Sequence, residues 1–244
     1  MINLKDKNEQ YLIFSLILVL ILHNIPSISI ITYPFNLLAT WIHEMGHGLT
    51  AEMFGGDFKK LVINADTSGY ASYLFPAGHN FARGIIASAG YMGTSIFGAM
   101  MLYFRKKDTF VKIFSLMLGI FMVLSLLIYI RSITGWLFGV PFSLLLLFVG
   151  LKSDSDINLF FYNFIASQIA LNAILDINVL FSVGNSRGGV TGMTLSSDAS
   201  VMSEVWIGPY WFWASVWLII SVTLFGYTYL KPLGSSKKKI ENSL

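Results

Sequence analysis

The sequence contains no cysteine among its 244 residues, and charged residues are scarce. Without cysteine, disulfide frameworks, thiol catalysis and cysteine-ligated zinc sites are excluded, so any bound metal must be held by His, Asp, Glu or water. Only 12% of the residues are charged, whereas soluble domains carry about 25%. The net charge of +3 is small, so we expect no nucleic-acid partner. Long polar stretches are also missing, which excludes a soluble domain of any size.

Apolar runs long enough to cross a bilayer recur along the whole chain instead. Hydrophobic residues make up 55% of the sequence, and the mean hydropathy is +0.67. This pattern predicts an all-α, multi-pass integral membrane protein, which we expect in the plasma membrane with membrane lipid as a partner. We expect a single domain over 1–244 with its core at 35–215, an additional N-terminal span within 1–34 and a polar tail at 231–244. Oligomeric state is not indicated. About seven transmembrane helices are predicted, at 11–31, 35–54, 81–104, 109–131, 133–151, 157–181 and 205–230.

The segment 57–78 differs from the rest of the chain. Two short apolar runs flank the turn-forming sequence Asp66-Thr67-Ser68-Gly69, which predicts a small β-hairpin after the second helix. A structured connecting loop is the alternative reading of the same signal. A hairpin has unpaired edges, so it must lie at the membrane interface or against protein. Its free edge is suited to binding an extended substrate as an added strand.

The most informative motif is His43-Glu44-Met45-Gly46-His47 in the second predicted span. Two histidines four apart on a helix project from one face, so both imidazoles can reach the same metal ion. The pattern predicts one zinc ion per chain held by His43 and His47. Glu44 then lies beside the open coordination position, where it can accept a proton from water held by the zinc. The alternative is a set of hydrogen bonds in a polar patch between helices.

The sixth predicted span carries a second polar stripe. Gln168, Asn172 and Asp176 are four residues apart and share one helical face. A lone carboxylate at membrane depth is costly unless a cation or metal accompanies it. We therefore expect Asp176 to be the third zinc ligand. Asn172 is a candidate oxyanion donor, or it only orients Asp176 or a neighbouring helix.

Other features give weaker expectations. Pro26 should kink or end the first helix, and His23 faces either the zinc or a neighbouring helix. Small residues through 81–104 favour close packing against the zinc-motif helix. The Gly/Ser-rich segment 182–204 is either a gate over the site or a simple connection. Basic residues lie on both predicted sides of the membrane, so the orientation stays open.

Several of these motifs together resemble the site-2 protease family of intramembrane zinc metallopeptidases, and most closely its short branch without PDZ domains. The resemblance rests on the His43–His47 motif, on Gly-Gly-Asp at 55–57 before the hairpin, and on three later segments, which are 89–93, 172–176 and 197–199. It covers most of 35–215. It implies that His43, His47 and Asp176 bind zinc and that Glu44 is the general base. It also implies that the substrate is a membrane-spanning helix, unwound and held by the hairpin.

The chain departs from the family pattern around the expected third ligand. The family usually has Leu-Asp-Gly there, whereas this sequence has Leu175-Asp176-Ile177, and the preceding Asn-Pro pattern is absent. The departure concerns the stabilisation of the oxyanion more than the metal ligands.

These observations predict a zinc-dependent intramembrane endopeptidase that hydrolyses peptide bonds of membrane-spanning substrates. One alternative is a non-proteolytic membrane protein that binds or transports metal, or an inactive relative that binds client helices. A transporter should spread ionisable residues over several spans, whereas here they concentrate in two. A membrane zinc enzyme acting on lipid or on prenylated protein ends shares the same motif.

Overall fold

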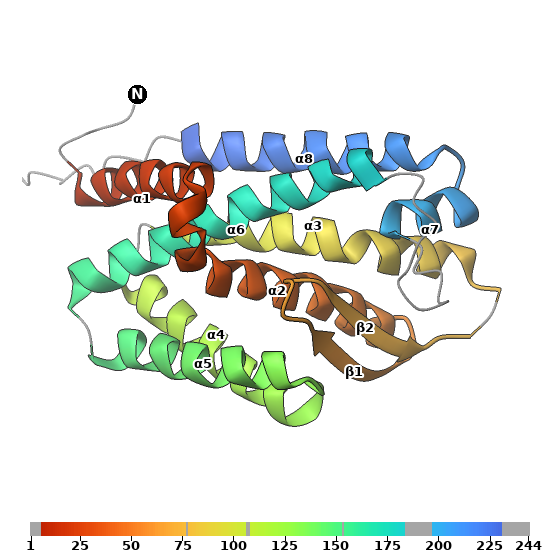
Figure 1. The fold of residues 1–244 in the computed structure, drawn as a ribbon, viewed down its shortest axis with the longest axis horizontal. Helices are drawn as coiled ribbons and strands as arrows, with labels where there is room; N and C mark the ends of the chain where they lie inside the picture. Colours follow the sequence, from red (N-terminus) through yellow and green to blue (C-terminus); the bar gives the residue numbers. More distant parts are fainter. Residues whose placement is uncertain (1–5, 77, 106–107, 153, 184–196, 231–244) are drawn as a thin grey trace, which may run out of the picture.

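The computed structural model describes residues 6–76, 78–105, 108–152, 154–183 and 197–230. Long helices run side by side, and a two-stranded hairpin lies at one end of the bundle (Figure 1). The elements in chain order are α1 (Lys7–Asn24), the short 3-10 helix η1 (Pro26–Ile31), α2 (Tyr33–Met53), β1 (Asp57–Ile63), β2 (Gly69–Leu74), α3 (Asn80–Phe104), α4 (Asp108–Ile128), α5 (Ile133–Lys152), α6 (Ser155–Val183), α7 (Asp198–Val205) and α8 (Tyr210–Leu230).

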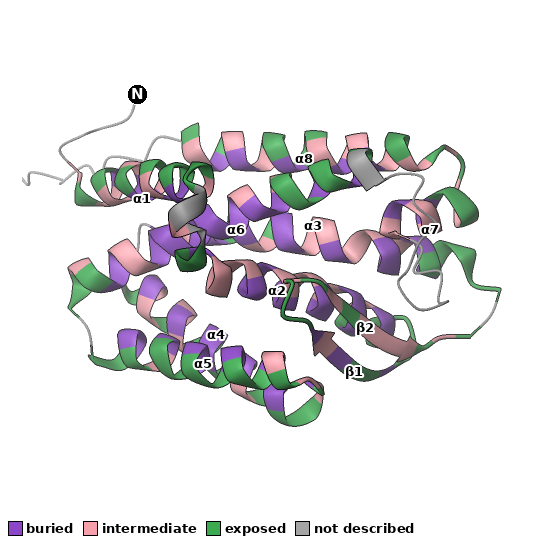
Figure 2. Ribbon diagram, in the orientation of Figure 1, coloured by how far each residue is buried: buried purple, intermediate pink, exposed green. Residues whose placement is uncertain are grey.

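Five helices within the described residues are long and apolar enough to cross a membrane, namely α3, α4, α5, α6 and α8. Their outward faces carry large apolar side chains, such as Leu137, Met117 and Ile219, which are 73%, 64% and 65% exposed. Figure 2 shows exposed positions along these helices. An apolar exterior of this kind is suited to lipid contact. The structure therefore confirms a mostly helical membrane protein with a small hairpin. It does not confirm seven spans, because α1 and α2 are helical but fall outside this set of five.

The predicted end of the first helix at Pro26 is confirmed. α1 ends at Asn24, and the chain continues as η1 from Pro26, because proline cannot continue the hydrogen bonding of an α-helix. After α2 the chain turns through Gly55, which has φ of +82°. Glycine adopts this left-handed conformation without steric cost and commonly ends helices.

The zinc-motif helix α2 lies in the middle of the bundle, packed on α3, α6 and the hairpin (Figure 1). Its approach to α3 is very close at Gly46, where an added Cβ would lie 2.5 Å from the carbonyl oxygen of Ala89. Small residues let helix backbones touch in this way. The prediction that 81–104 packs against the zinc-motif helix is thus confirmed.

The hairpin is antiparallel, with Leu61 opposite Ala71 and an irregularity in register between Phe58 and Lys60. The outer edge of β1 is covered by the connection between α4 and α5. The Leu61 N–H donates to the Tyr129 carbonyl at 2.9 Å, and the Arg131 N–H donates to the Leu61 carbonyl at 2.9 Å. Because both backbone groups of Leu61 bond away from β2, those of Ala71 point to the opposite edge of the hairpin. That second edge faces the zinc-motif helix.

Two side chains of α2 hold the hairpin turn. The Tyr33 hydroxyl donates to the Ala65 carbonyl at 2.8 Å, and the Thr40 hydroxyl donates to the Thr67 carbonyl at 2.6 Å. Thr67 itself has a positive φ of 69°, which is uncommon for a β-branched residue. These bonds fix the position of β2 along α2.

A buried ion pair joins α1, α3 and α8 at the end of the bundle distant from the hairpin. Arg105 donates to Glu9 at 3.4 Å and to the Thr228 carbonyl at 3.2 Å, and both ionic side chains are almost completely buried. Glu9→Ala should destabilise the protein by about 3–5 kcal/mol, because it leaves a buried charge unpaired. Thermal unfolding in detergent measures this. Lys7→Ala is the control, because it removes only the exposed pair with Asp156 and should leave the melting temperature nearly unchanged. Equal melting temperatures for wild type and Glu9→Ala would contradict the expectation.

The structure adds one helix that the sequence did not predict. α7 lies within the segment expected to be a loop, and its N-cap is Ser197, whose side chain accepts from the Ser200 N–H. Residues 184–196, which belong to the segment expected to be either a gate or a simple connection, and the polar tail at 231–244 lie outside the described residues.

Candidate metal centre

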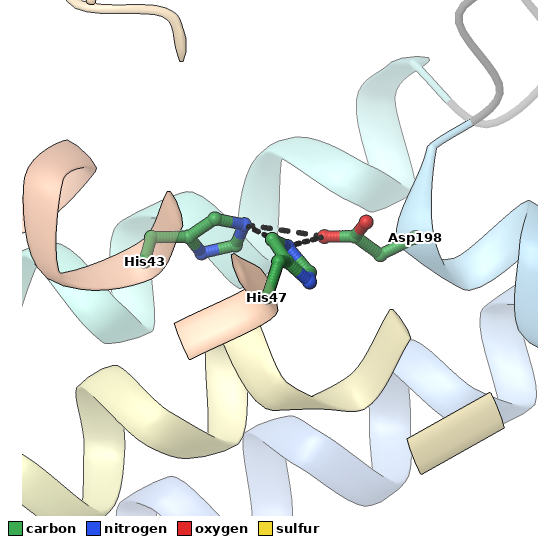
Figure 3. Close-up of side chains that lie close together, drawn as sticks. All are labelled: His43, His47 and Asp198. Atoms are coloured by element: carbon green, nitrogen blue, oxygen red, sulfur yellow. Dashed lines mark hydrogen bonds and ion pairs between the residues drawn. The ribbon is translucent and has the colours of Figure 1, made fainter. Parts of the chain in front are cut away.

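The two histidines of α2 meet as their spacing predicts. One helical turn separates them, and their Nε2 atoms lie 3.0 Å apart. Both rings point toward the start of α7 (Figure 3).

Asp198 completes the group from α7. Its Oδ2 atom lies 3.2 Å from Nε2 of His43 and 3.2 Å from Nε2 of His47, and Figure 3 shows the three side chains converging. Asp198 is the first residue of α7, directly after the N-cap, where a carboxylate is favoured by the helix dipole. Among the described residues, these three are the group of His, Asp and Glu side chains spaced to share one metal ion.

The spacing of the donor atoms fits zinc. Ligands bound tetrahedrally at 2.0–2.1 Å from zinc lie about 3.3 Å apart. The three separations in the structure, 3.0, 3.2 and 3.2 Å, are close to this value. Three ligands from the protein leave a fourth position open, which is the arrangement of catalytic zinc sites.

The hydrogen bonding of His47 also suits a metal ligand. Its Nδ1–H donates to the carbonyl of Ile86 on α3 at 2.7 Å. Such a bond fixes the tautomer, so the Nε2 lone pair is free to bind a metal. Ile86 therefore orients the ring from outside the donor group.

Gly90 on α3 leaves the space that the group needs. A Cβ atom added to Gly90 would lie 2.4 Å from Nε2 of His43 and 2.4 Å from Nε2 of His47. Any side chain at this position would occupy the point where the two imidazoles converge. The backbone of α3 thus forms one wall of the site.

The charge on Asp198 is set by its two histidine neighbours. Burial alone would raise the pKa of the carboxyl group, but the adjacent His47 and His43 outweigh burial and hold the pKa well below its usual range. Asp198 is therefore ionised at neutral pH, as a carboxylate ligand must be.

Glu44 lies beside the donor group and is only 7% exposed. Its carboxylate accepts a hydrogen bond from the Ala71 N–H, which lies on the edge of β2 that faces α2. Glu44 also borders both of the cavities that open on the site. The hairpin thus holds the carboxylate next to the proposed metal position.

The first cavity, of about 310 Å³, runs along β2. Its lining combines the donor group and Glu44 with the strand, and comprises His43, Glu44, His47, Gly69, Tyr70, Ala71, Tyr73, Tyr91, Ser197 and Asp198. Burial raises the pKa of the Tyr73 phenol, and the charges of Asp198 and Glu44 add to that effect. Tyr73 therefore stays protonated and can donate a hydrogen bond into this cavity.

The second cavity, of about 410 Å³, extends from Glu44 toward the hairpin turn and α6. It is lined by His23, Asn36, Thr40, His43, Glu44, Thr67, Ser68, Gly69, Tyr91, Asn172, Leu175, Asp176 and Val179. The two cavities share four residues, which are His43, Glu44, Gly69 and Tyr91. The two cavities therefore adjoin at Glu44.

The structure differs from the sequence-based prediction at the third ligand. Asp198, not Asp176, lies with the two histidines, and Asp176 lines the second cavity instead. In this cavity Asp176 lies with His23 of α1 and with Thr67 and Ser68 of the hairpin turn. The sequence indicated Asp198 only through its place in Ser197-Asp198-Ala199, which we noted as part of the family resemblance without a role. The serine N-cap was the local signal for α7.

Asn172 and His23 belong to a network behind the second cavity. Asn172 accepts at 3.2 Å from Nε2 of His23 and donates at 3.2 Å to Oδ1 of Asn36 and at 3.4 Å to the Phe35 carbonyl. His23 therefore contacts α6, as the neighbouring-helix reading expected. The amide nitrogen of Asn172 already joins α6 to α2, and its predicted oxyanion role stays a prediction.

Comparison with known proteins identifies one matching family. The sequence profile of the Peptidase M50B-like family matches residues 11–228, which span almost all of the helices and the whole donor group. No curated protein and no solved structure matches the chain.

Proposed function

The chain belongs to the Peptidase M50B-like family, and from this membership we propose that it is a zinc-dependent endopeptidase that cuts membrane-spanning proteins. The family match agrees with the resemblance to site-2 proteases and with a metallopeptidase in a membrane. The observation that carries the proposal is the convergence of His43, His47 and Asp198 beside the buried carboxylate of Glu44.

In this proposal His43, His47 and Asp198 hold one zinc ion. When bound, zinc supplies Lewis acidity, which makes water more acidic and polarises a peptide carbonyl. Glu44 accepts a proton from the attacking water and later passes it to the leaving amine. The protonated Tyr73 hydroxyl offers a hydrogen-bond donor to the developing oxyanion.

The free edge of β2 is the proposed holder of the substrate. A peptide bond inside an intact helix is shielded by its own hydrogen bonds, so the substrate must be extended before attack. The edge of β2 at Gly69 and Ala71 borders the first cavity, and the Ala71 N–H on it already donates to Glu44. An extended segment can pair with the remaining backbone groups of this edge as an added strand. Such pairing would bring the backbone of a membrane-spanning substrate to Glu44.

Glu44→Gln tests the reaction. The variant should keep its zinc, because Glu44 is not among the donor atoms, and should lose cleavage of a fluorogenic transmembrane peptide in vesicles by a factor of about 10²–10⁴. Metal content and cleavage rate are measured on the same preparation. Undiminished cleavage would refute the general-base role. A wild-type protein that binds zinc but cuts no peptide would favour the alternative of a metal-binding or client-binding membrane protein.

A further inference from the structure

Asp176 is an acidic side chain in the second cavity that the proposed reaction does not use. It is exposed on α6, between the apolar residues Leu175 and Ile177, and it lines the same cavity as His43 and Glu44. In the described part of the chain, the side chain of Asp176 has no ion-pair partner. A carboxylate at membrane depth is costly without a cation, and the donor group that was expected to supply one is completed by Asp198.

The carboxylates of this cavity favour a positively charged ligand. Its lining contains two carboxylates, Asp176 and Glu44, and no Lys or Arg. Asn172 is hydrogen-bonded to both His23 and Asn36. The remaining polar side chains of the lining come from the hairpin turn and from Thr40, His43 and Tyr91. The Asp176 carboxylate can therefore accept a hydrogen bond from a ligand, while His23, Asn36 and Asn172 are held in place by their own hydrogen bonds.

The cavity adjoins the proposed path of the substrate. It shares the lining residues His43, Glu44, Gly69 and Tyr91 with the first cavity. In the proposed function, a strand bound along β2 would therefore reach the second cavity on one side of the cut bond. Exposed Leu175 and Val179, at 38% and 54%, flank Asp176 on α6. They suit the apolar stem of a Lys or Arg side chain whose charged end reaches the carboxylate.

We propose that Asp176 selects substrates that carry a Lys or Arg residue a few positions from the cut bond. The inference rests on the proposed function, because it assigns the second cavity to the same substrate. Asp176 acts here as a specificity determinant, while the metal ligands and Glu44 perform the reaction.

The test measures peptide binding without cleavage. The full-length protein carries Glu44→Gln and is placed in phosphatidylcholine vesicles, whose headgroup has no primary amine. The probes are transmembrane peptides of Leu and Ala with a central Asn-Gly pair. A single Lys, Gln or Glu is scanned along each peptide. At one or two positions, the Lys peptide should bind about tenfold more tightly than the Gln peptide, as one desolvated charge pair predicts.

Charge exchange at position 176 gives the sharper result. Asp176→Asn should make the Lys and Gln peptides bind equally, and Asp176→Lys should reverse the preference in favour of Glu. Asp156→Asn is the matched control on the same helix, since Asp156 pairs with Lys7 at the far end of α6, and it should leave the Lys preference unchanged. Equal binding of all peptides, no binding of any peptide, or a Lys preference that survives Asp176→Asn would each overturn the proposal.

A cleavage measurement with Glu44 restored separates this inference from the proposed function. If the Lys preference depends on Asp176 but no peptide is cut, the peptidase assignment fails and the recognition site stands. If peptides are cut at rates that do not depend on their charge, the peptidase assignment stands and the role of Asp176 fails.

Discussion

Zinc is expected to stay bound to an Asp176→Ala variant and to be lost from an Asp198→Ala variant. The two aspartates are both acidic residues near the two histidines in the fold, but only Asp198 places an oxygen within 3.2 Å of both Nε2 atoms. Removing it leaves two imidazoles, which is too few protein ligands for a stable zinc site. Metal analysis of the purified proteins should give about one zinc per chain for wild type and Asp176→Ala, and close to none for Asp198→Ala.

A further variant separates the loss of a zinc ligand from the unfolding of α7. If Asp198→Ala loses zinc only because α7 unfolds, Asp198→Asn should restore the helix without restoring full zinc affinity, since the amide has no negative charge. Zinc retained by Asp198→Ala and lost from Asp176→Ala would return the third-ligand role to α6 and overturn the proposed site.

A single methyl group at Gly90 is expected to abolish zinc binding and cleavage together. The added Cβ would lie 2.4 Å from both Nε2 atoms, so the imidazoles must swing away from the point they share. Alanine is a better helix former than glycine, and the atoms it meets are the ends of side chains. The variant should therefore fold normally while zinc content falls to near zero, as metal analysis and circular dichroism would measure.

Gly93→Ala is the matched control for this change. It lies one turn further along α3, and its added Cβ meets only the Cα atom of Gly46, at the ordinary contact distance of 3.9 Å. The control should keep zinc and activity. Normal zinc content in Gly90→Ala, or equal loss in both variants, would contradict the close approach of α3 to the metal position.

The parts of the structure that follow from local chemistry were predictable from the sequence. Pro26 ends α1, a glycine with positive φ follows α2, and the turn at 66–69 joins two strands. The spacing of His43 and His47 placed both on one helical face. Each of these features depends on a few neighbouring residues and on backbone geometry that the residue types dictate.

The third member of the donor group depends on tertiary packing, and in this structure Asp198 rather than the predicted Asp176 lies with the two histidines. Asp176 attracted the prediction because a carboxylate in an apolar helix needs a partner. That argument concerns the free energy of burying a charge in the membrane, and it does not determine which side of α6 faces the histidines. Asp198 lies more than 150 positions from His43 and next to a Gly/Ser-rich segment, so only the packing of α7 on α3 and α8 brings it to the histidines.

Polar residues explain why seven spans were predicted and five candidate spans are found among the described residues. α1 and α2 were predicted as spans because of their apolar stretches, but α1 begins with the polar run Lys7–Gln10, and α2 carries the polar residues of the site. The polar residues of the site make α2 less hydrophobic on average than the five candidate spans.

X-ray absorption at the zinc edge tests the central claim most directly, because it reports the ligands of the bound ion. For the wild-type protein the account predicts a first shell of about four nitrogen and oxygen atoms near 2.0–2.1 Å, with the outer-shell scattering of two imidazoles. The carboxylate contribution should persist in Asp176→Ala. Fewer than two imidazoles in the first shell of the wild-type protein would contradict the site formed by His43, His47 and Asp198. Identical spectra for the wild-type protein and Asp198→Ala would also contradict it.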